Sequence, residues 1–587
     1  MKEWLEQILQ SNFALKENEG EDKVIPLDEA ISRNVKPGMN LHISTQANAS
    51  VCQLIRCFAH TKPEFTLTIN AVTNHALNLI HLNLAKKLIT SNCGFFYPVP
   101  GPVPLIQKAY KEKRVEIENW SSYVLLQRLM ASALGLGFMP TKSLLGSSIA
   151  KENADSFVTI ADPFEKEQTF GLVKALSPDI SLVHAFAADR YGNTILPPPY
   201  AEGIWGPAAS KNGAIVTVEQ LVSTDFIRSH PNFVHIPGYL VKSVSVAPFG
   251  AHPMGIINEG LDGLEGYGVD YDFLLAHRQA CSEPAALDAW IEEWILSCAN
   301  HGDYLNKLGV DRLRLLKGAT EKDIWRYELE SQAEGISRST DYNQVEMMVV
   351  AAGRKMKERI TEQDCRMVLT GIGSATIAAW LAYYQLQKEG YGLDLIEGFG
   401  VMGYAPRPAC PVFGHVSNAR TAKVLADIGI TYGVAVAGKH NRCLSILGAA
   451  QLDKYGNINT SKIGDLYLLG PGGAADAVNA RETIVIATQS KSRFLEKVPY
   501  ITYPGERIKI LVSNMGIFEK LGGEEFVLTA YFPDKKIKTK EGIIQVIKEN
   551  CGWELKVAPQ VAEAEPPTLD ELMIIRLLDP KGIYLRG

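Results

Sequence analysis

The chain has 587 residues, of which 46% are hydrophobic and 21% are charged, and its formal net charge is −6. At roughly 100–200 residues per domain, this length excludes a single core and predicts two to four globular domains. The mild negative charge excludes a basic surface for nucleic acid, and no window holds the ~20 consecutive apolar residues of a membrane span. The nine scattered cysteines match no zinc pattern, so we expect reduced thiols, a cytoplasmic protein and no metal site.

The first elements alternate between helical and extended patterns. Residues 1–23 predict an amphipathic helix and a charged linker, without the apolar core of a signal peptide. Leu41–Ser44 is typical of a buried strand, and the small polar loop 45–50 after it opens a helix. Phe65–Val72 predicts the next strand, again followed by a helix. Strands that alternate with helices predict open α/β domains with mainly parallel sheets.

Further along, residues 94–104 form a Pro-Gly-rich loop, and residues 285–308 have a helical pattern. Residues 310–345 are rich in charge. We therefore expect one domain over 24–320, a connecting segment over 321–340 and a second α/β domain over 341–587.

The two halves repeat each other. Asp189–Asn193 (DRYGN) matches Asp453–Asn457 (DKYGN), and Gly206–Ala209 (GPAA) matches Gly470–Gly473 (GPGG). Both matches have the same offset, since 453 − 189 and 470 − 206 are each 264. Two matches at one offset, each after an apolar strand, predict two related domains in tandem. A cleft between such domains is a natural ligand site.

The stretch Leu393–Pro406 (LDLIEGFGVMGYAP) reads as a strand that ends in a glycine-rich turn. Glu397 stands at the tip of this strand, and Gly398, Gly400 and Gly403 follow it. Glycine permits positive φ values and close backbone approach, and open α/β sheets bind ligands at the carboxyl ends of their strands. Glu397 is therefore the leading candidate for a catalytic carboxylate, although a surface glutamate in a loop would have the same pattern.

The turn Gly470–Asp476 also suits a ligand. Successive glycines before a helix expose backbone N–H groups, which bind an oxyanion or a phosphate. A tight strand-to-helix turn would look the same.

These residues resemble family I coenzyme A transferases, most closely the glutaconate CoA-transferases. Residues from about 24 to 320 are similar to the family's A subunit, through strings such as ASALGLGFMP, APFGAHP and DYLNKLG. Residues from about 341 to 580 are similar to its B subunit, through GAAQLDKYGNINTSKIGD, GPGGAAD and the Glu397 stretch. The resemblance covers nearly the whole chain and implies two subunits fused into one polypeptide.

The resemblance implies a ping-pong reaction in which Glu397 attacks an acyl-CoA and becomes a glutamyl-CoA thioester, from which a second small carboxylic or dicarboxylic acid takes the CoA. Coenzyme A is then a substrate, and no cofactor is permanently bound. Gly472 and Gly473 would supply N–H donors to the oxyanion, a role in which the loss of one donor typically costs on the order of 10²–10³ in rate. The family's heteromers also imply a homo-oligomer for a fused chain.

The turns after the first strand of each half complete the expected site. We expect Ser44, Thr45 and Gln46 to line the acyl pocket. Gly371, Gly373 and Gly400 are expected to bind CoA or the oxyanion. Ordinary turn chemistry explains these residues equally well.

One departure from the family motif leaves the reaction open. The motif reads E-S-G followed by two apolar residues, and aligning its glycine with Gly400 puts Gly398 where the acid belongs, so Glu397 is one residue early. An extra residue in the turn, such as Phe399, would restore Glu397 to the site. Without it, strand alternation would turn Glu397 away from the cleft. The fold would then suit an acyl-CoA decarboxylase or carbon–carbon bond hydrolase, which needs no glutamyl thioester.

Other reactive side chains are weaker candidates. Cys410 and the nearby His415 are a possible nucleophile and base, although a buried structural cysteine is the simpler interpretation. His184 and His252 adjoin apolar strands and are expected to be hydrogen-bonded core or pocket-wall residues. A non-catalytic regulator on this fold is disfavoured because the sequence has no helix-turn-helix segment and no basic face.

Overall fold

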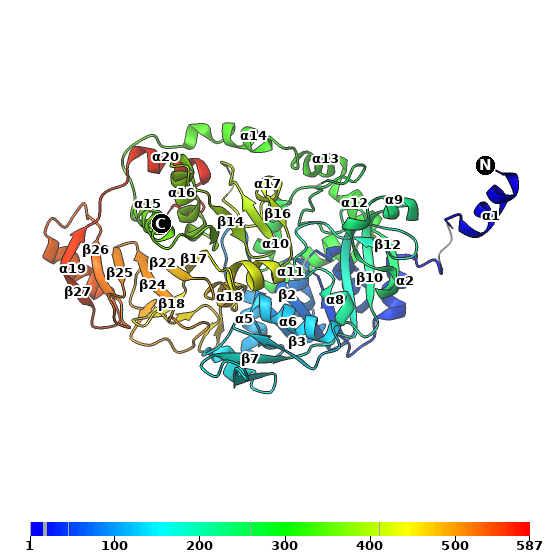
Figure 1. Ribbon diagram of the computed structural model, residues 1–587, viewed down its shortest axis with the longest axis horizontal. Helices are drawn as coiled ribbons and strands as arrows, with labels where there is room; N and C mark the ends of the chain where they lie inside the picture. The colour runs from blue at the N-terminus through cyan, green and yellow to red at the C-terminus, as the bar shows by residue number, and fades with distance from the viewer. Residues whose placement is uncertain (1, 16–19, 45, 259, 410, 587) are drawn as a thin grey trace.

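The computed structural model describes residues 2–15, 20–44, 46–258, 260–409 and 411–586. The chain forms two lobes, each built on a mainly parallel sheet that is flanked by helices (Figure 1). This confirms the prediction of an α/β protein with two tandem domains, whereas the exact domain limits at 24–320 and 341–587 stay a prediction.

The first sheet has the parallel strand order β12-β10-β8-β1-β2-β3-β4. Its strands are β1 (Asn40–Ile43), β2 (Phe65–Val72), β3 (Ala85–Cys93), β4 (Glu116–Asn119), β8 (Ile180–Ala188), β10 (Ala214–Leu221) and β12 (Val241–Val246). Two antiparallel strands, β9 (Thr194–Ile195) and β11 (Val234–Ile236), extend it beyond β8, and β5 (Phe138–Thr141), β6 (Phe157–Ala161) and β7 (Thr169–Lys174) form a small separate sheet. Every residue of β8 is buried, as expected for a parallel strand with both faces covered.

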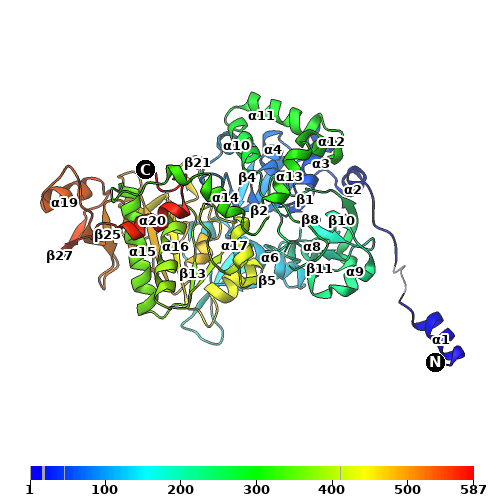
Figure 2. The same cartoon turned by 90° about the horizontal axis from the view of Figure 1, so that it is seen from above.

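Helices cover both faces of the first sheet. The helices of this part of the chain are α2 (Leu27–Asn34), α3 (Asn48–Phe58), α4 (His75–His81), α5 (Pro104–Lys111), α6 (Ser122–Ala133), α7 (Ser148–Glu152), α8 (Trp205–Ala209), α9 (Thr224–Ser229), α10 (Tyr271–Ala280), α11 (Pro284–Ile291), α12 (His301–Leu308) and α13 (Val310–Gly318). The predicted helical segment 285–308 is confirmed but is broken once: a π-helical turn ends α11, and Asn300 then caps α12 by accepting from the N–H of Asp303 at 3.0 Å. The amphipathic helix predicted near the N-terminus is α1 (Glu3–Phe13), which buries no residue and stands away from the two lobes (Figure 2).

The second sheet has the order β16-β15-β14-β13-β17-β22-β24-β25-β26-β27. The parallel centre consists of β14 (Asp394–Glu397), β13 (Met367–Leu369), β17 (Cys443–Gly448), β22 (Glu482–Ala487) and β24 (Ile508–Ser513). The flanking strands are β15 (Val401–Tyr404), β16 (Val424–Leu425), β25 (Gly516–Glu519), β26 (Val527–Tyr531) and β27 (Lys556–Glu563). Its main helices are α15 (Gln344–Glu362), α16 (Ser374–Lys388), α17 (Val416–Thr421), η5 (Gly429–Val436), α18 (Ala474–Ala477), α19 (Lys540–Glu549) and α20 (Leu569–Leu578).

The internal repeat is visible in atomic detail. In the first copy, Asp189 Oδ1 accepts from the N–H groups of Tyr191 and Asn193 at 3.0 and 2.9 Å. In the second copy, Asp453 Oδ1 accepts from the N–H groups of Tyr455 and Asn457, both at 3.0 Å. β10 lies next to β8 as β22 lies next to β17, so the two lobes share turn chemistry and sheet position.

The two lobes pack tightly against each other. One buried apolar cluster contains Trp120 and Leu126 of the first lobe together with Ile396 and Tyr432 of the second. The charged connection between them includes α13 and α14 (Ile324–Glu330), which run along the top of the molecule in Figure 1.

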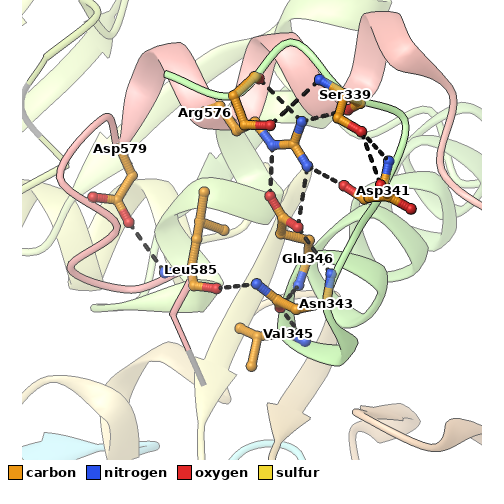
Figure 3. Close-up of polar contacts among 9 residues, drawn as sticks. Ser339, Asp341, Asn343, Val345, Glu346, Arg576, Asp579 and Leu585 are labelled. Atoms are coloured by element: carbon orange, nitrogen blue, oxygen red, sulfur yellow. Dashed lines mark hydrogen bonds and ion pairs between the residues drawn. The ribbon is translucent and has the colours of Figure 1, made fainter. Parts of the chain in front are cut away.

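The C-terminal helix α20 binds the segment that leads into the second lobe. Arg576 on α20 donates to Glu346 Oε1 at 2.7 Å and to the carbonyls of Ser339 and Asp341, both at 2.6 Å (Figure 3). Asn343 caps α15, and Asp579 accepts from the N–H groups that follow α20 (Figure 3). Just beyond, the hydroxyl of Tyr584 donates to the carbonyl of Pro98 at 3.0 Å and so supports the Pro-Gly-rich loop of the first lobe.

Candidate active site

A cavity of about 810 Å³ lies where the carboxyl ends of the two sheets meet. The first lobe contributes residues at the ends of β1, β2 and β3, and the second contributes the ends of β13 and β17 and the turn after β14. Open α/β sheets bind ligands at such strand ends, and both halves of the chain are needed to enclose this space. We take it as the candidate active site.

Glu397 is the last residue of β14 and is fully buried. Its Oε1 accepts a hydrogen bond from Asn418 Nδ2 at 2.8 Å and a longer one from the N–H of Gly414 at 3.4 Å. Its Oε2 has no hydrogen-bond partner among the described residues. Burial raises the pKa of Glu397 to about 8, and the bonds from Asn418 and Gly414 only partly oppose this.

The carboxyl group lies one residue behind the cavity wall. Gly398 and Phe399 line the cavity, whereas Glu397 is not among the lining residues. Ile396 packs into the cluster shared by both lobes, and Leu395 packs on the opposite face of the sheet with Trp380. Because side chains alternate along a strand, Glu397 shares the face of Leu395, where α17 provides Asn418.

The irregularity in this hairpin is not where the sequence suggested. Glu397 pairs with Val401 across the turn of residues 398–400, and the register shifts farther back, where Leu395 pairs with Tyr404 and Ile396 with Met402. Gly403 is therefore the extra residue in β15, and Phe399 belongs to the turn itself. The bulge at Gly403, which has a φ of 69°, does not change the face on which Glu397 lies.

The hydroxyl of Tyr432 is wedged between two glycines of the site. A Cβ atom added to either Gly398 or Gly473 would collide with the Tyr432 hydroxyl. The turn after Glu397 and the GPGG turn therefore face each other across this one hydroxyl group. Burial raises the pKa of Tyr432, so the hydroxyl stays protonated and able to donate a hydrogen bond.

The GPGG turn is bound to the first lobe. The N–H of Gly472 donates to the carbonyl of Ser91 at 2.8 Å, and Gly472 in turn accepts from the N–H of Ser122 at 2.9 Å. Asp476, which follows Gly473 on α18, accepts from Ser121 Oγ at 2.6 Å and fixes the start of α6. The GPGG turn thus joins the two lobes beside the cavity.

This arrangement corrects half of the predicted donor pair. Gly472 lines the cavity, but its N–H is already bonded to Ser91 and is not free for an oxyanion. Within the described residues, the N–H of Gly473 and the hydroxyl of Tyr432 have no hydrogen-bond partner. Tyr432 was not predicted, and an isolated aromatic residue in an apolar helix gives no sequence signal for this position.

The other predicted site residues divide between wall and support. Ser44, Gln46 and Gly371 line the cavity, whereas Thr45 lies outside the described residues. Gly373 and Gly400 do not line it: the first starts α16, and the second, with a φ of 120°, packs against the carbonyl of Ala426. These two glycines shape the turns and do not contact the cavity.

The histidines behave as expected from the sequence. His184 lines the cavity and is bonded to Thr217 Oγ1 at 3.0 Å and to Glu219 Oε1 at 2.7 Å. His252 is buried in the core between Tyr304 and Asp270, at 2.5 and 3.0 Å.

His415 lies in the cavity wall, and burial lowers its pKa to about 4. Its Nδ1 accepts from the N–H of Ser417 at 3.2 Å, which leaves little base character on that nitrogen. Cys410, the proposed partner of His415, lies outside the described residues.

Two groups of cavity residues escaped the sequence analysis. Glu202, in the loop between β9 and α8, lines the cavity and is only 5% exposed. The Pro-Gly-rich loop contributes the rings of Phe95, Phe96 and Tyr97. The aromatic residues among the prolines of this loop were the available signal for a binding role.

Metal and membrane features are not found in the described part of the chain. No group of three or more His, Cys, Asp or Glu side chains there is placed to hold a metal ion. No helix among the same residues is long and apolar enough to cross a bilayer.

Comparisons with known proteins agree with this geometry. The coenzyme A transferase family model matches residues 24–247. The B subunit of the 3-oxoadipate CoA-transferase of Pseudomonas knackmussii is 31% identical over 268 residues, which are 42% of this chain and 96% of that relative. The A subunit of the glutaconate CoA-transferase of Acidaminococcus fermentans is 30% identical over 235 residues, which are 36% of this chain and 68% of that relative.

The fold is also that of a solved acyl-CoA transferase. The thioester complex of YdiF with CoA from Escherichia coli O157:H7 superposes with a TM-score of 0.62, at 14% identity, over 94% of this chain and 96% of that one. Relatives of the two subunit types match different parts of this chain, so it unites both types in one polypeptide. The chain therefore belongs to the coenzyme A transferase family and is an enzyme of the CoA-transferase type.

Proposed function

We propose that this enzyme moves coenzyme A from an acyl-CoA to a carboxylic acid through a thioester on Glu397. The observation that carries the proposal is a buried carboxyl group with one unpartnered oxygen, at a strand end one residue from the cavity wall. A carboxylate nucleophile needs such a dry site beside a space that holds the acyl group.

The proposed reaction balances without any further reactant. The Glu397 carboxylate attacks the thioester carbon, the carbon–sulfur bond breaks, and the CoA thiolate leaves an acyl-glutamyl anhydride. The thiolate then attacks the glutamyl carbonyl, which releases the first acid as a carboxylate and leaves a glutamyl-CoA thioester. A second carboxylate takes the CoA by the same two steps in reverse.

Tyr432 and Gly473 are the proposed oxyanion donors. The hydroxyl of Tyr432 lies between the turn after Glu397 and the GPGG turn, and its proton and the N–H of Gly473 are both uncommitted within the described residues. Donors that are fixed before the reaction stabilise the charge that develops in the transition state.

The reaction requires the Glu397 side chain to turn. In its present rotamer the carboxyl group is held by Asn418 on the far side of the cavity wall, as a largely protonated acid. Rotation about the side-chain bonds would exchange the Asn418 bond for the donors beside Gly398. We propose that acyl-CoA binding favours this second rotamer.

Activity of matched variants tests the proposal. Glu397→Gln should abolish transfer of CoA from acetyl-CoA to a range of carboxylic acids. Glu328 on α14 is a half-buried acid that also has an unpartnered oxygen and a raised pKa, but it lies outside the cavity. Glu328→Gln should therefore retain activity, and full transfer by Glu397→Gln would refute the nucleophile.

The orientation of Glu397 also favours a second candidate function. If the carboxyl group stays on Asn418, the same cavity would suit an acyl-CoA decarboxylase or carbon–carbon bond hydrolase without a covalent intermediate. Such an enzyme would consume acyl-CoA with no acceptor acid present. A strict requirement for a second carboxylic acid would exclude it.

We further propose that the enzyme is a cytoplasmic homo-oligomer. An apolar strip that includes Leu136, Phe138 and Val158 is 51%, 55% and 55% exposed, which is unusual for a surface that meets only water. Sedimentation of the full chain should show a species heavier than 64.5 kDa.

A further inference from the structure

Glu202 is the one carboxylic acid among the described residues that line the cavity. It is buried, and its Oε1 has no hydrogen-bond partner within the described residues. Burial raises the pKa of Glu202 to about 7, and the only opposing contribution comes from its own backbone N–H. A buried polar group without a partner is costly, so an unpaired carboxyl group in a ligand cavity points to a ligand that pairs with it.

The loop that carries Glu202 is tied to the turn after Glu397. The N–H of Tyr200 donates to the carbonyl of Ala426 at 2.9 Å, and the N–H of Ile428 donates to the carbonyl of Ala201 at 3.0 Å. The N–H of Ala426 in turn donates to Gly400 at 2.7 Å. These bonds hold Glu202 of the first lobe next to the hairpin that bears Glu397 of the second.

The cavity offers little positive charge for a second carboxylate. Arg493 is the one lysine or arginine among the described lining residues, and it follows β22, which β13 and β17 separate from β14. Burial lowers the pKa values of His42, His277 and His415 to about 4, so these three rings are neutral near pH 7.

Aromatic rings line the wall between the two lobes. Tyr97 and Tyr271 lie 4.5 Å apart between ring centroids, and Tyr271 stacks on His415 at 6.3 Å with an interplanar angle of 11°. Two residues before His415, Phe413 meets Phe399 edge to face at 5.0 Å between ring centroids. Such a row of rings is suited to an apolar or planar group and offers a second carboxylate no positive charge.

We propose that the carboxylic acid substrate is an apolar, ring-bearing monocarboxylic acid that carries an uncharged hydrogen-bond donor, and that Glu202 binds this donor and excludes dicarboxylates. The aromatic row holds the body of the acid. A hydroxyl or amide N–H on that body donates to the free oxygen of Glu202. A second carboxylate would instead meet a like charge with no cation beside it. This inference rests on the proposed CoA transfer and specifies the substrate of the same cavity.

Binding of three acids to the full-length protein tests the inference apart from turnover. Isothermal titration calorimetry at pH 7.5 would compare 4-hydroxyphenylacetate, phenylacetate and glutarate. We expect the hydroxylated ring to bind about tenfold or more tightly than phenylacetate, because a hydrogen bond to a charged partner is typically worth this much. Glutarate should bind most weakly.

Two variants and a control assign the preference to Glu202. Glu202→Leu should remove the advantage of the hydroxyl group and tighten glutarate binding. Glu202→Gln, which keeps the shape and an acceptor oxygen, should retain part of that advantage and also tighten glutarate binding. Glu328→Gln should leave all three affinities unchanged.

Three results would overturn the role of Glu202, and a fourth would separate it from the proposed CoA transfer. Equal or tighter binding of glutarate by the wild type, no binding of either aromatic acid, or ratios that the Glu202 variants leave unchanged would overturn the inference. If the predicted binding pattern is found but CoA transfer to every acid is absent, the proposed function fails and the assignment of Glu202 stands.

Discussion

Replacing Glu397 with Gln should stabilise the protein, and the gain should grow with pH. The folded pKa of Glu397 is raised from 4.5 to about 8, so below pH 4.5 the acid is neutral in both states and the variant gains nothing. Above that pH the unfolded glutamate ionises while the buried one stays protonated, and folding the wild type therefore becomes costlier. Between pH 4.5 and 8 this cost rises by about 1.4 kcal/mol per pH unit.

The magnitude follows from the two pKa values. With 4.5 unfolded and about 8 folded, the cost is about 1 kcal/mol at pH 5 and about 3 kcal/mol at pH 7. Glutamine keeps an acceptor for Asn418 and carries no charge, so the variant avoids this cost. Between pH 5 and pH 7 the advantage of the variant therefore grows by about 2 kcal/mol.

Native-state hydrogen exchange of the β14 amides is the appropriate assay, because a chain with two lobes is not expected to unfold in one step. Wild type and variant would be compared at the same pH, which cancels the intrinsic pH dependence of exchange. We expect exchange in the variant to be slower about fivefold at pH 5 and about 150-fold at pH 7. Equal ratios at the two pH values would refute the buried, protonated state of Glu397.

Three further predictions concern the reaction. Gly473→Ala should lower kcat at least tenfold because the added Cβ would collide with the hydroxyl of Tyr432. Gly472→Ala should retain activity, since no atom lies closer than 3.9 Å to its added Cβ and a side chain at a φ of 53° costs only about 1 kcal/mol. Similar losses in both variants would contradict the assignment of Gly473 and Tyr432 as donors. The kcat/KM for acyl-CoA should rise with pH and reach half its maximum near pH 8, the pKa of Glu397, and a flat profile would exclude an ionising nucleophile with this pKa. Asn418→Ala removes the bond that lowers this pKa and should shift the same profile to higher pH, so an unshifted profile would show that Asn418 does not hold the carboxyl group.

The sequence was sufficient to predict the two-lobed fold because its signals are local. In each Asp-x-Tyr-Gly-Asn turn, the aspartate accepts hydrogen bonds from residues of the same five-residue stretch, and the same bonds recur in both lobes. Short apolar runs such as Phe65–Val72 form parallel strands, and they are also local signals, because a strand that is buried on both faces has apolar residues along its whole length.

The position of the carboxyl group could not be read in this way. Glu397 is oriented by Asn418, which lies 21 residues later on α17 and packs onto β14 only in the folded lobe. The bulge at Gly403 sets the pairing of the hairpin, yet glycines at 398, 400 and 403 are equally plausible sites for it in the sequence.

Contacts between the lobes were also beyond the sequence. The N–H of Gly472 is used by Ser91, a residue of the other lobe, so a glycine that looks free in its own turn is not. Glu202 and Tyr432 join the site in the same way, through a cavity that needs both lobes. The internal repeat predicted that the lobes are related, but it carries no information on which surfaces face each other.

The intact mass of the enzyme after incubation with an acyl-CoA and no acceptor acid tests Glu397 as the nucleophile most directly. We expect a covalent mass gain equal to coenzyme A minus water, which hydroxylamine removes and which is located on the peptide that contains Glu397. An enzyme that turns over acyl-CoA while its mass never changes would rule out a thioester on Glu397.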